Sequence, residues 1–169
     1  LIVSGGWDGH QPKEVADIFA DVLRQEGFEA EIAYTLDAFL DEERLMKLDL
    51  IVPVWTMGEI SNEQLQPVLK AVESGVGMAG CHGGMCDSFR NSGEGQFLTG
   101  SQWVAHPFND GVEYEVRMAR PSSSPLIEGI PDFTVKSEQY YLHVDPVVDV
   151  LATTTFRISE GPHSANGEI

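Results

Sequence analysis

The sequence predicts an α/β fold in which a mainly parallel sheet lies between two layers of helices. Short apolar strands alternate with helical segments through the first half of the chain, and this alternation is typical of βαβ units. Glycines close several of the apolar runs, as expected where a strand turns into a helix. The length of 169 residues suits one domain. We therefore expect a single three-layer α/β/α domain over residues 1–169.

The first elements follow from apolar spacing and turn residues. A strand over residues 1–3 runs into a glycine turn, and Pro12 suits the first turn of a helix that Gly27 ends. We then expect a strand over residues 28–34, a short helix over 39–45 and an apolar strand over 50–55. These elements complete the first βαβ unit.

The next helix has a recognisable start. Ser61 and Gln64 form a predicted capping box, and Gly75 ends the helix. Pro67 lies inside it and suggests either a kink or a later start. A strand over residues 76–81 follows and leads into a second glycine-rich turn.

The pattern is less regular after residue 95. Residues 112–116 alternate like a half-exposed strand, residues 121–131 are rich in loop formers, and residues 147–156 predict a late strand and turn. The turn-like pair Asn166-Gly167 stands just before the end. Another strand should follow such a turn, so we expect the domain to be cut before its last strand and helix.

Composition excludes several classes of partner. The formal net charge is −17, which argues against binding to nucleic acid or to anionic lipid; it indicates an acidic surface, or alternatively an acidic pocket that attracts a cation. No apolar run is long enough to span a membrane, and no signal peptide is visible. The two cysteines do not form a disulfide framework, so we expect a reducing, cytoplasmic setting. The sequence leaves open whether the chain forms a homo-oligomer.

Three segments are expected to meet in one crevice. In parallel sheets ligands bind beyond the carboxyl ends of the strands. The segments that follow the predicted strands are residues 5–10, 55–58 and 81–87. This places Trp7, His10, Trp55 and Asp87 among the candidate ligand-binding residues.

The turn Gly80-Cys81-His82-Gly83-Gly84 is the main candidate for the functional centre, and we call residues 80–84 the elbow. Glycines on both sides of His82 permit a sharp strand-to-helix turn that exposes the central side chain. Gly83 and Gly84 then bring backbone N–H groups towards the same spot. Cys81 should point down into the sheet. Two alternatives stay open: a glycine-rich turn with a packed thiol, or a reactive Cys81.

Two later segments add polar side chains. Gln139, Tyr141, His143 and Asp145 share one face if their segment is extended, and Gln102, Trp103 and His106 lie within a few residues of one another. Aromatic rings beside amides, carboxylates and imidazoles suit a sugar-like ligand, because its C–H faces stack and its hydroxyls need donors and acceptors.

Metal binding is an open alternative. Several histidines together with Asp87 and Asp145 could bind a divalent metal, although the sequence has no HExxH helix and no pair of histidines at H-x₃-H spacing. The sequence also lacks a Walker motif and a GxGxxG motif, so nucleotide binding is not expected.

At these residues the chain resembles the ThuA-like (trehalose utilisation) family of the class I glutamine amidotransferase-like superfamily. The matching stretches are residues 4–10, 77–87, 100–107 and 138–146. The resemblance implies a flavodoxin-like sheet and a role in carbohydrate metabolism, on trehalose or its keto derivatives. True amidotransferases carry cysteine where this chain has His82, so hydrolysis of glutamine through a thioester is not expected.

Two functions follow as hypotheses. In the first, the protein is a sugar-processing enzyme in which His82 and His143 are acid/base groups. Asp145 or Asp87 would orient an imidazole or bind a cation, while Gln139, Tyr141 and Trp103 position the sugar. In the second, it is a non-catalytic carbohydrate-binding or regulatory domain that has lost the nucleophile. A Cys81 hydrolase is a third and weaker alternative.

Overall fold

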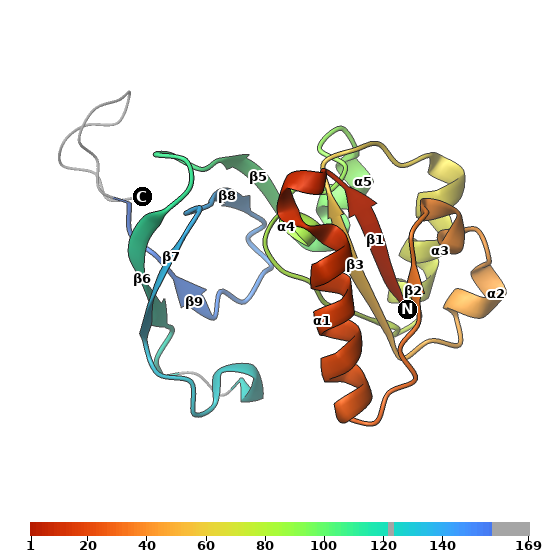
Figure 1. The fold of residues 1–169 in the computed structure, drawn as a ribbon, viewed down its shortest axis with the longest axis horizontal. Helices are drawn as coiled ribbons and strands as arrows, with labels where there is room; N and C mark the ends of the chain where they lie inside the picture. Colours follow the sequence, from red (N-terminus) through yellow and green to blue (C-terminus); the bar gives the residue numbers. More distant parts are fainter. Residues whose placement is uncertain (122–123, 157–169) are drawn as a thin grey trace. The chain divides into compact units, whose positions relative to one another are not determined.

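The computed structural model describes residues 1–121 and 124–156, which form two compact units (Figure 1). The first unit consists of Leu1–Trp103 and Leu142–Asp145. The second consists of Val104–Tyr141 and the described residues from Pro146 onward. The predicted turn at residues 166–167 lies outside the described residues. The expectation of one domain over the whole chain, cut before its last strand and helix, stays a prediction.

The first unit is built on a four-stranded parallel sheet with the strand order β2-β1-β3-β4. Its strands are β1 (Ile2–Gly6), β2 (Ile32–Ala33), β3 (Leu50–Thr56) and β4 (Gly77–Met78). Along the whole of β1 the partner is β3, from Ile2 opposite Val52 to Gly6 opposite Thr56. The predicted parallel sheet is confirmed, and its order is that of a flavodoxin-like fold.

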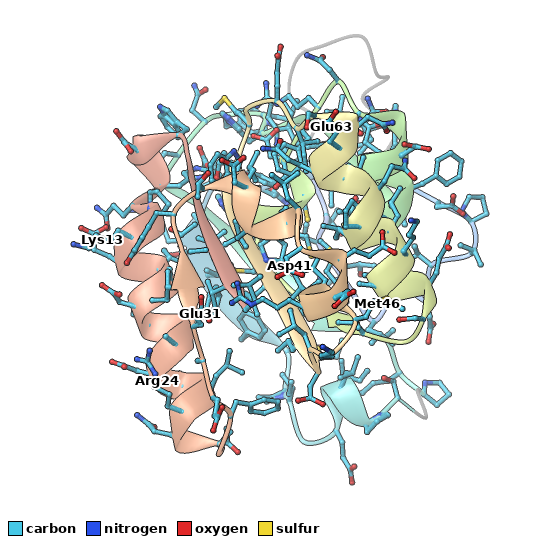
Figure 2. All side chains as sticks on the ribbon, turned by 90° about the vertical axis from the view of Figure 1, so that its right-hand side faces the viewer. Lys13, Arg24, Glu31, Asp41, Met46 and Glu63 are labelled. Atoms are coloured by element: carbon cyan, nitrogen blue, oxygen red, sulfur yellow. The ribbon has the colours of Figure 1, made fainter. Side chains whose placement is uncertain are left out.

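One face of this sheet is covered by α1 (Pro12–Gln25). Pro12 occupies the first turn of the helix, as predicted. Figure 2 shows Lys13 on the outer side of this helix, whereas Arg24 near its end donates to the Ala30 carbonyl at 2.9 Å. The buried residues between α1 and the sheet are Ile2, Ala16, Ala20, Val52 and Val54. Small alanines on the inner face let the helix approach the strands closely.

The opposite face is covered by η2 (Leu36–Phe39), α2 (Glu42–Leu45) and α3 (Asn62–Glu73). The buried cluster on this side is larger, with members Leu1, Val3, Leu36, Phe39, Leu45, Ile51, Val68, Ala71, Val76 and Phe89. Because both faces of the sheet are buried, β1 and β3 are apolar without alternation. The predicted three layers are thus present in this unit.

The start of α3 confirms the predicted capping box. The Gln64 backbone N–H donates to the Ser61 hydroxyl at 3.2 Å, and the Ser61 N–H donates to the Gln64 side-chain oxygen at 3.1 Å. The helix begins at Asn62 and continues through Pro67. The alternative of a later start is therefore wrong, and the helix accommodates the proline in its interior.

Two predicted strands are shorter in the structure. The strand expected over residues 28–34 is limited to β2, and the one expected over residues 76–81 is limited to β4. Among the described residues, each lies at an edge of the sheet and has a ladder partner on one side alone. Ladder pairing, which local apolar sequence does not reveal, sets the length of such strands.

The first unit also contains short elements that carry the candidate site residues: η1 (Asp8–His10), α4 (Gly83–Cys86) and α5 (Gly93–Thr99). After α5 the chain enters β5 (Ser101–Ala105), which forms a two-stranded sheet with β8 (Tyr141–Val144). The boundary between the two units falls within both of these strands.

The second unit contains an antiparallel sheet with the order β7-β6-β9. Its strands are β6 (Val112–Met118), β7 (Phe133–Ser137) and β9 (Ala152–Thr153), and η3 (Pro125–Ile127) lies between β6 and β7. Along β6 half-buried and exposed side chains alternate, as predicted. On its exposed face Glu113 stands opposite Lys136, a cross-strand pair of opposite charge.

None of the described helices is long and apolar enough to cross a membrane. The longest of them, α1, has 14 residues, several of them charged, whereas a span needs about 20 apolar ones.

Candidate functional site

The elbow has the sharp turn that its glycines predict. His82 has φ 51° and ψ −144°, a conformation that is rare for a residue with a side chain. It caps α4, and its carbonyl accepts a hydrogen bond from the Cys86 N–H at 2.9 Å. A strained residue between a strand and a helix is the arrangement that presents a catalytic side chain in nucleophile elbows. Here the residue at that position is His82, which is half-buried, with its Nε2 atom buried.

His10 meets His82 from the loop after β1. The two imidazole rings are edge to face, with centroids 4.9 Å apart. His10 Nδ1 and the Thr56 hydroxyl, at the end of β3, are 2.9 Å apart and share a hydrogen bond. Thr56 is buried, so this bond fixes the orientation of the His10 ring. Of the three segments expected to meet, each supplies part of this cluster.

Gly83 is required for the two histidines to approach. A Cβ atom at this position would lie 2.6 Å from the His10 ring and 3.0 Å from the Thr56 methyl carbon. The His10 ring and the Thr56 side chain cannot easily move away from such an atom, because they are hydrogen-bonded to each other. The glycine after His82 therefore makes room for His10.

Trp7 provides an aromatic surface beside the histidines. Its ring lies edge to face with His10 at a centroid distance of 4.8 Å, and 48% of the residue is exposed. A half-exposed indole beside polar groups is typical of sites that stack the C–H face of a sugar ring. We define the elbow cluster as Trp7, His10, Thr56, His82 and Gly83.

The two histidines are also the residues of this cluster that could hold a metal. Each offers a ring nitrogen, and the two nitrogens lie within 4.8 Å of each other. His10 Nδ1 shares a hydrogen bond with the Thr56 hydroxyl, so the His10 nitrogen that would bind a metal is Nε2. Metal-binding histidines are commonly oriented by such a hydrogen bond from their other ring nitrogen. Two imidazoles would fill two of the coordination positions of a divalent ion.

Cys81 was expected to point into the sheet, and this prediction is wrong. It is exposed, because β4 ends at Met78 and the chain leaves the ladder before the elbow. Even so, partial loss of water around the sulfur raises the pKa of the Cys81 thiol above its ordinary value. Exposure gives access to the thiol, but the raised pKa keeps it protonated near neutral pH.

We expect Cys81 to react slowly with iodoacetamide at pH 7 in the native protein and faster as the pH rises. The thiolate is the reacting form, and a raised pKa moves its appearance to higher pH. Mass spectrometry of alkylated Cys81 across pH 6–10 measures this, with a small thiol as reference. Rapid alkylation at pH 7 would restore the reactive-cysteine hypothesis.

Asp87 and Trp103 are joined through an arginine. Asp87 is 3% exposed and forms a two-point ion pair with Arg90, including one bond of 2.8 Å. The Arg90 guanidinium lies over the Trp103 ring, 4.0 Å from its centroid. In the structure these two predicted ligand-binding residues take part in a packed charged network. No local pattern in the sequence indicated Arg90 as their common partner.

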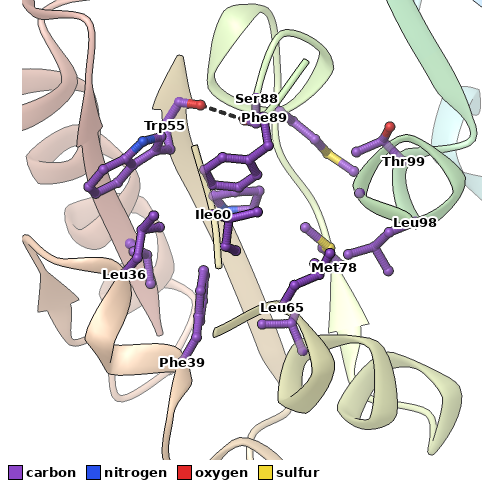
Figure 3. A pocket seen from close by; sticks show the side chains of 15 residues that line it. Leu36, Phe39, Trp55, Ile60, Leu65, Met78, Ser88, Phe89, Leu98 and Thr99 are labelled. Carbon is purple, nitrogen blue, oxygen red and sulfur yellow. Dashed lines mark hydrogen bonds between the residues drawn. The ribbon is translucent and has the colours of Figure 1, made fainter. Parts of the chain in front are cut away.

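Trp55 faces the interior. With other residues of the larger core it lines a cavity of about 20 Å³, room for about one water molecule. Figure 3 shows its ring beside Leu36 and Ile60, and its carbonyl oxygen accepting a hydrogen bond from the Ser88 hydroxyl. The glycine at position 5 lies against the same ring. The Trp55 ring thus packs against the larger core near the end of β3.

Gln102, His143 and Asp145 line a different surface. Together with α5 residues they form an open cleft of about 280 Å³ in the first unit. Among the described residues that line this cleft, neither His10 nor His82 appears. His143 and Asp145 therefore belong to a surface other than the elbow cluster.

The remaining predicted residues lie in the second unit. Gln139 is buried, and its amide donates to the Thr154 hydroxyl at 2.7 Å and to the Thr155 carbonyl at 3.1 Å. Tyr141 packs edge to face on Phe156. Tyr141 and His143 both lie in β8 and, two positions apart, share one face of that strand, whereas Gln139 and Asp145 lie outside it.

His106 lies beside a carboxylate that the sequence did not single out. Its Nε2 is 3.7 Å from Glu138, and its ring stacks on Tyr140 with centroids 6.2 Å apart. The Tyr114 hydroxyl donates to the Glu138 carbonyl at 3.1 Å. Glu138 directly precedes Gln139 but lies far from His106 in sequence, so no local pattern links the pair.

A family model identifies the family of this chain, and a solved structure shares its fold. The model of the ThuA family, described as trehalose utilisation, matches residues 1–168. A crystal structure described as a ThuA-like protein, from Bacteroides uniformis, is similar with a TM-score of 0.73 and 15% identity. The match covers 89% of this chain and 64% of that one, so this chain spans less than two thirds of the longer protein. At this identity the likeness shows the fold alone. No curated protein matches the chain.

Proposed function

We propose, because this chain belongs to the ThuA (trehalose utilisation) family, that it carries out acid–base chemistry on a sugar at the elbow cluster. The observation that supports this most is the pair of imidazoles, His82 in its strained turn and His10 held by Thr56. Imidazole serves as either a base or an acid near neutral pH, so the two rings supply both roles to the same ligand.

The chemistry that fits is proton transfer next to a carbonyl of a keto-sugar. The neutral imidazole accepts the proton from the carbon beside the carbonyl, and the protonated imidazole donates its proton to the carbonyl oxygen. An enediol results. The ring that is now protonated returns a proton to the former carbonyl carbon, while the ring that is now neutral takes the proton from the hydroxyl on the first carbon, and the isomerisation is complete without any net change of oxidation state. Trp7 would stack on the sugar ring.

Deuterium exchange tests this proposal without knowledge of the final product. A keto derivative of trehalose is incubated in D₂O with the protein, and NMR follows exchange at the carbons beside the carbonyl. We expect exchange above the background rate, and at least about 10-fold slower exchange in Thr56→Val, which leaves His10 unoriented. Exchange at the background rate in the presence of bound sugar would reject the acid–base proposal.

One observation favours a second candidate, a non-catalytic sugar-binding domain. The apex of the elbow carries His82 in the place of a nucleophile, and the adjacent Cys81 has a raised pKa. This candidate predicts that sugars bind at the elbow cluster while neither exchange nor conversion occurs. The same experiment therefore separates the two candidates.

A further inference from the structure

The cleft beside α5 is a second concave surface of the first unit. We call it the α5 cleft and define it by Gln96, Phe97, Ser101, Gln102, His143 and Asp145. It lies where α5 ends, β5 begins and β8 ends. Its volume of about 280 Å³ is at the lower end for small-molecule sites, so it suits a ligand of one sugar ring better than a larger molecule.

An exposed aromatic ring forms one wall. Phe97 is 80% exposed, among the most exposed of the large apolar side chains in the described residues. A single exposed apolar residue needs no explanation. Phe97, however, stands at a concavity together with two amides, an imidazole and a carboxylate. A flat apolar face surrounded by hydrogen-bonding groups matches the two surfaces of a sugar ring.

The backbone under the cleft is held in place. Gly100 ends α5 in the left-handed conformation with φ 68°, and its carbonyl accepts a hydrogen bond from the Asp145 N–H at 2.9 Å. The Thr99 hydroxyl is 3.1 Å from the Gln96 carbonyl and 3.0 Å from the Ser101 carbonyl. These hydrogen bonds connect the end of α5 to the start of β5 and to the residue that follows β8. A cleft that is already formed loses little entropy when it binds.

The charge of the residues that line the α5 cleft favours neutral sugars over phosphorylated ones. The described residues that line the α5 cleft include one carboxylate, Asp145, and neither lysine nor arginine. The net charge of the whole chain is −17. A phosphorylated sugar would meet neither lysine nor arginine among these residues and would be repelled by the surrounding negative field.

We propose that the α5 cleft is a binding site for a neutral sugar ring, separate from the elbow cluster, with Phe97 as the stacking surface. Gln102 and Asp145 would hydrogen-bond the hydroxyls. The choice of sugar as ligand rests on the proposed function, whereas the separate position and the preference for a neutral ligand rest on the cleft itself.

Amide shifts in ¹H–¹⁵N NMR spectra of the chain test the site. Glucose and trehalose are titrated in turn, and glucose 6-phosphate serves as the charged probe. We expect glucose or trehalose to shift the amides of Gly100, Ser101 and Gln102, and glucose 6-phosphate to leave them in place. Phe97→Ala should weaken this binding at least about 10-fold, as loss of a stacking ring does, and leave the shifts at Gly83 unchanged.

Leu126→Ala is the matched control, because Leu126 is also an exposed apolar residue, at 74%, and lies in the second unit. Absence of shifts around Gly100 with either neutral sugar, or shifts that persist in Phe97→Ala, would overturn the α5 cleft as a site. Self-association of the chain that Phe97→Ala abolishes would overturn it too, since the surface would then bind a second copy. Shifts at the α5 cleft without deuterium exchange at the elbow would reject the proposed function and keep this inference.

Discussion

Replacing His82 with Asn is expected to lower the rate of deuterium exchange into the keto-sugar by at least about 10²-fold. His82 presents one of the two imidazoles, and no other titratable side chain of the elbow cluster besides His10 is available for proton transfer. Asn tolerates a positive φ better than most residues, so the substitution removes the acid/base group while the turn is kept. Exchange followed by NMR at saturating sugar measures the effect on the chemical step.

Gly83→Ala provides the complementary variant. It leaves both histidines in the chain but places a Cβ atom 2.6 Å from the His10 ring, so the imidazoles must separate. We expect it to slow exchange as His82→Asn does. Thermal unfolding of both variants guards against loss of the fold. If His82→Asn folds, binds sugar and exchanges at the wild-type rate, His82 has no part in the mechanism.

Replacing Arg90 with Met is expected to lower the free energy of unfolding by about 1–3 kcal/mol, the range for leaving a buried polar group without its partner; Arg90 itself is 42% exposed. The reason is that the Asp87 carboxylate is 3% exposed and would be left without the guanidinium that forms two bonds to it. Methionine keeps much of the length of the side chain over Trp103, so the loss reports mainly the charge. Urea unfolding followed by circular dichroism measures it.

Arg24→Met is the matched control. Arg24 and Asp21 also form an Asp–Arg pair three residues apart, but both side chains are largely exposed, at 51% and 72%. Exposed pairs contribute about 0–1 kcal/mol, so Arg24→Met should leave stability nearly unchanged. Equal effects of the two substitutions would show that the burial of Asp87 does not strengthen its dependence on arginine.

The sequence predicted those features that local patterns encode. The parallel sheet follows from apolar runs buried on both faces, the start of α3 from the Ser61–Gln64 pair, and the turn at His82 from the glycines beside it. Each of these depends on residues within a few positions of one another. The meeting of His10 with His82 was also predictable, because all strands of a parallel sheet end at the same edge.

Tertiary structure alone decided which polar residues pair. Thr56 holds His10 across 46 positions in sequence, and Glu138 lies beside His106 in a unit whose boundary no compositional change marks. Alternation places Tyr141 and His143 on one face of β8, whereas Gln139 and Asp145, predicted to share that face, lie outside the strand. Periodicity describes the direction of a side chain relative to its own strand. What that side chain meets depends on how distant segments pack, and the sequence carries no local signal for that.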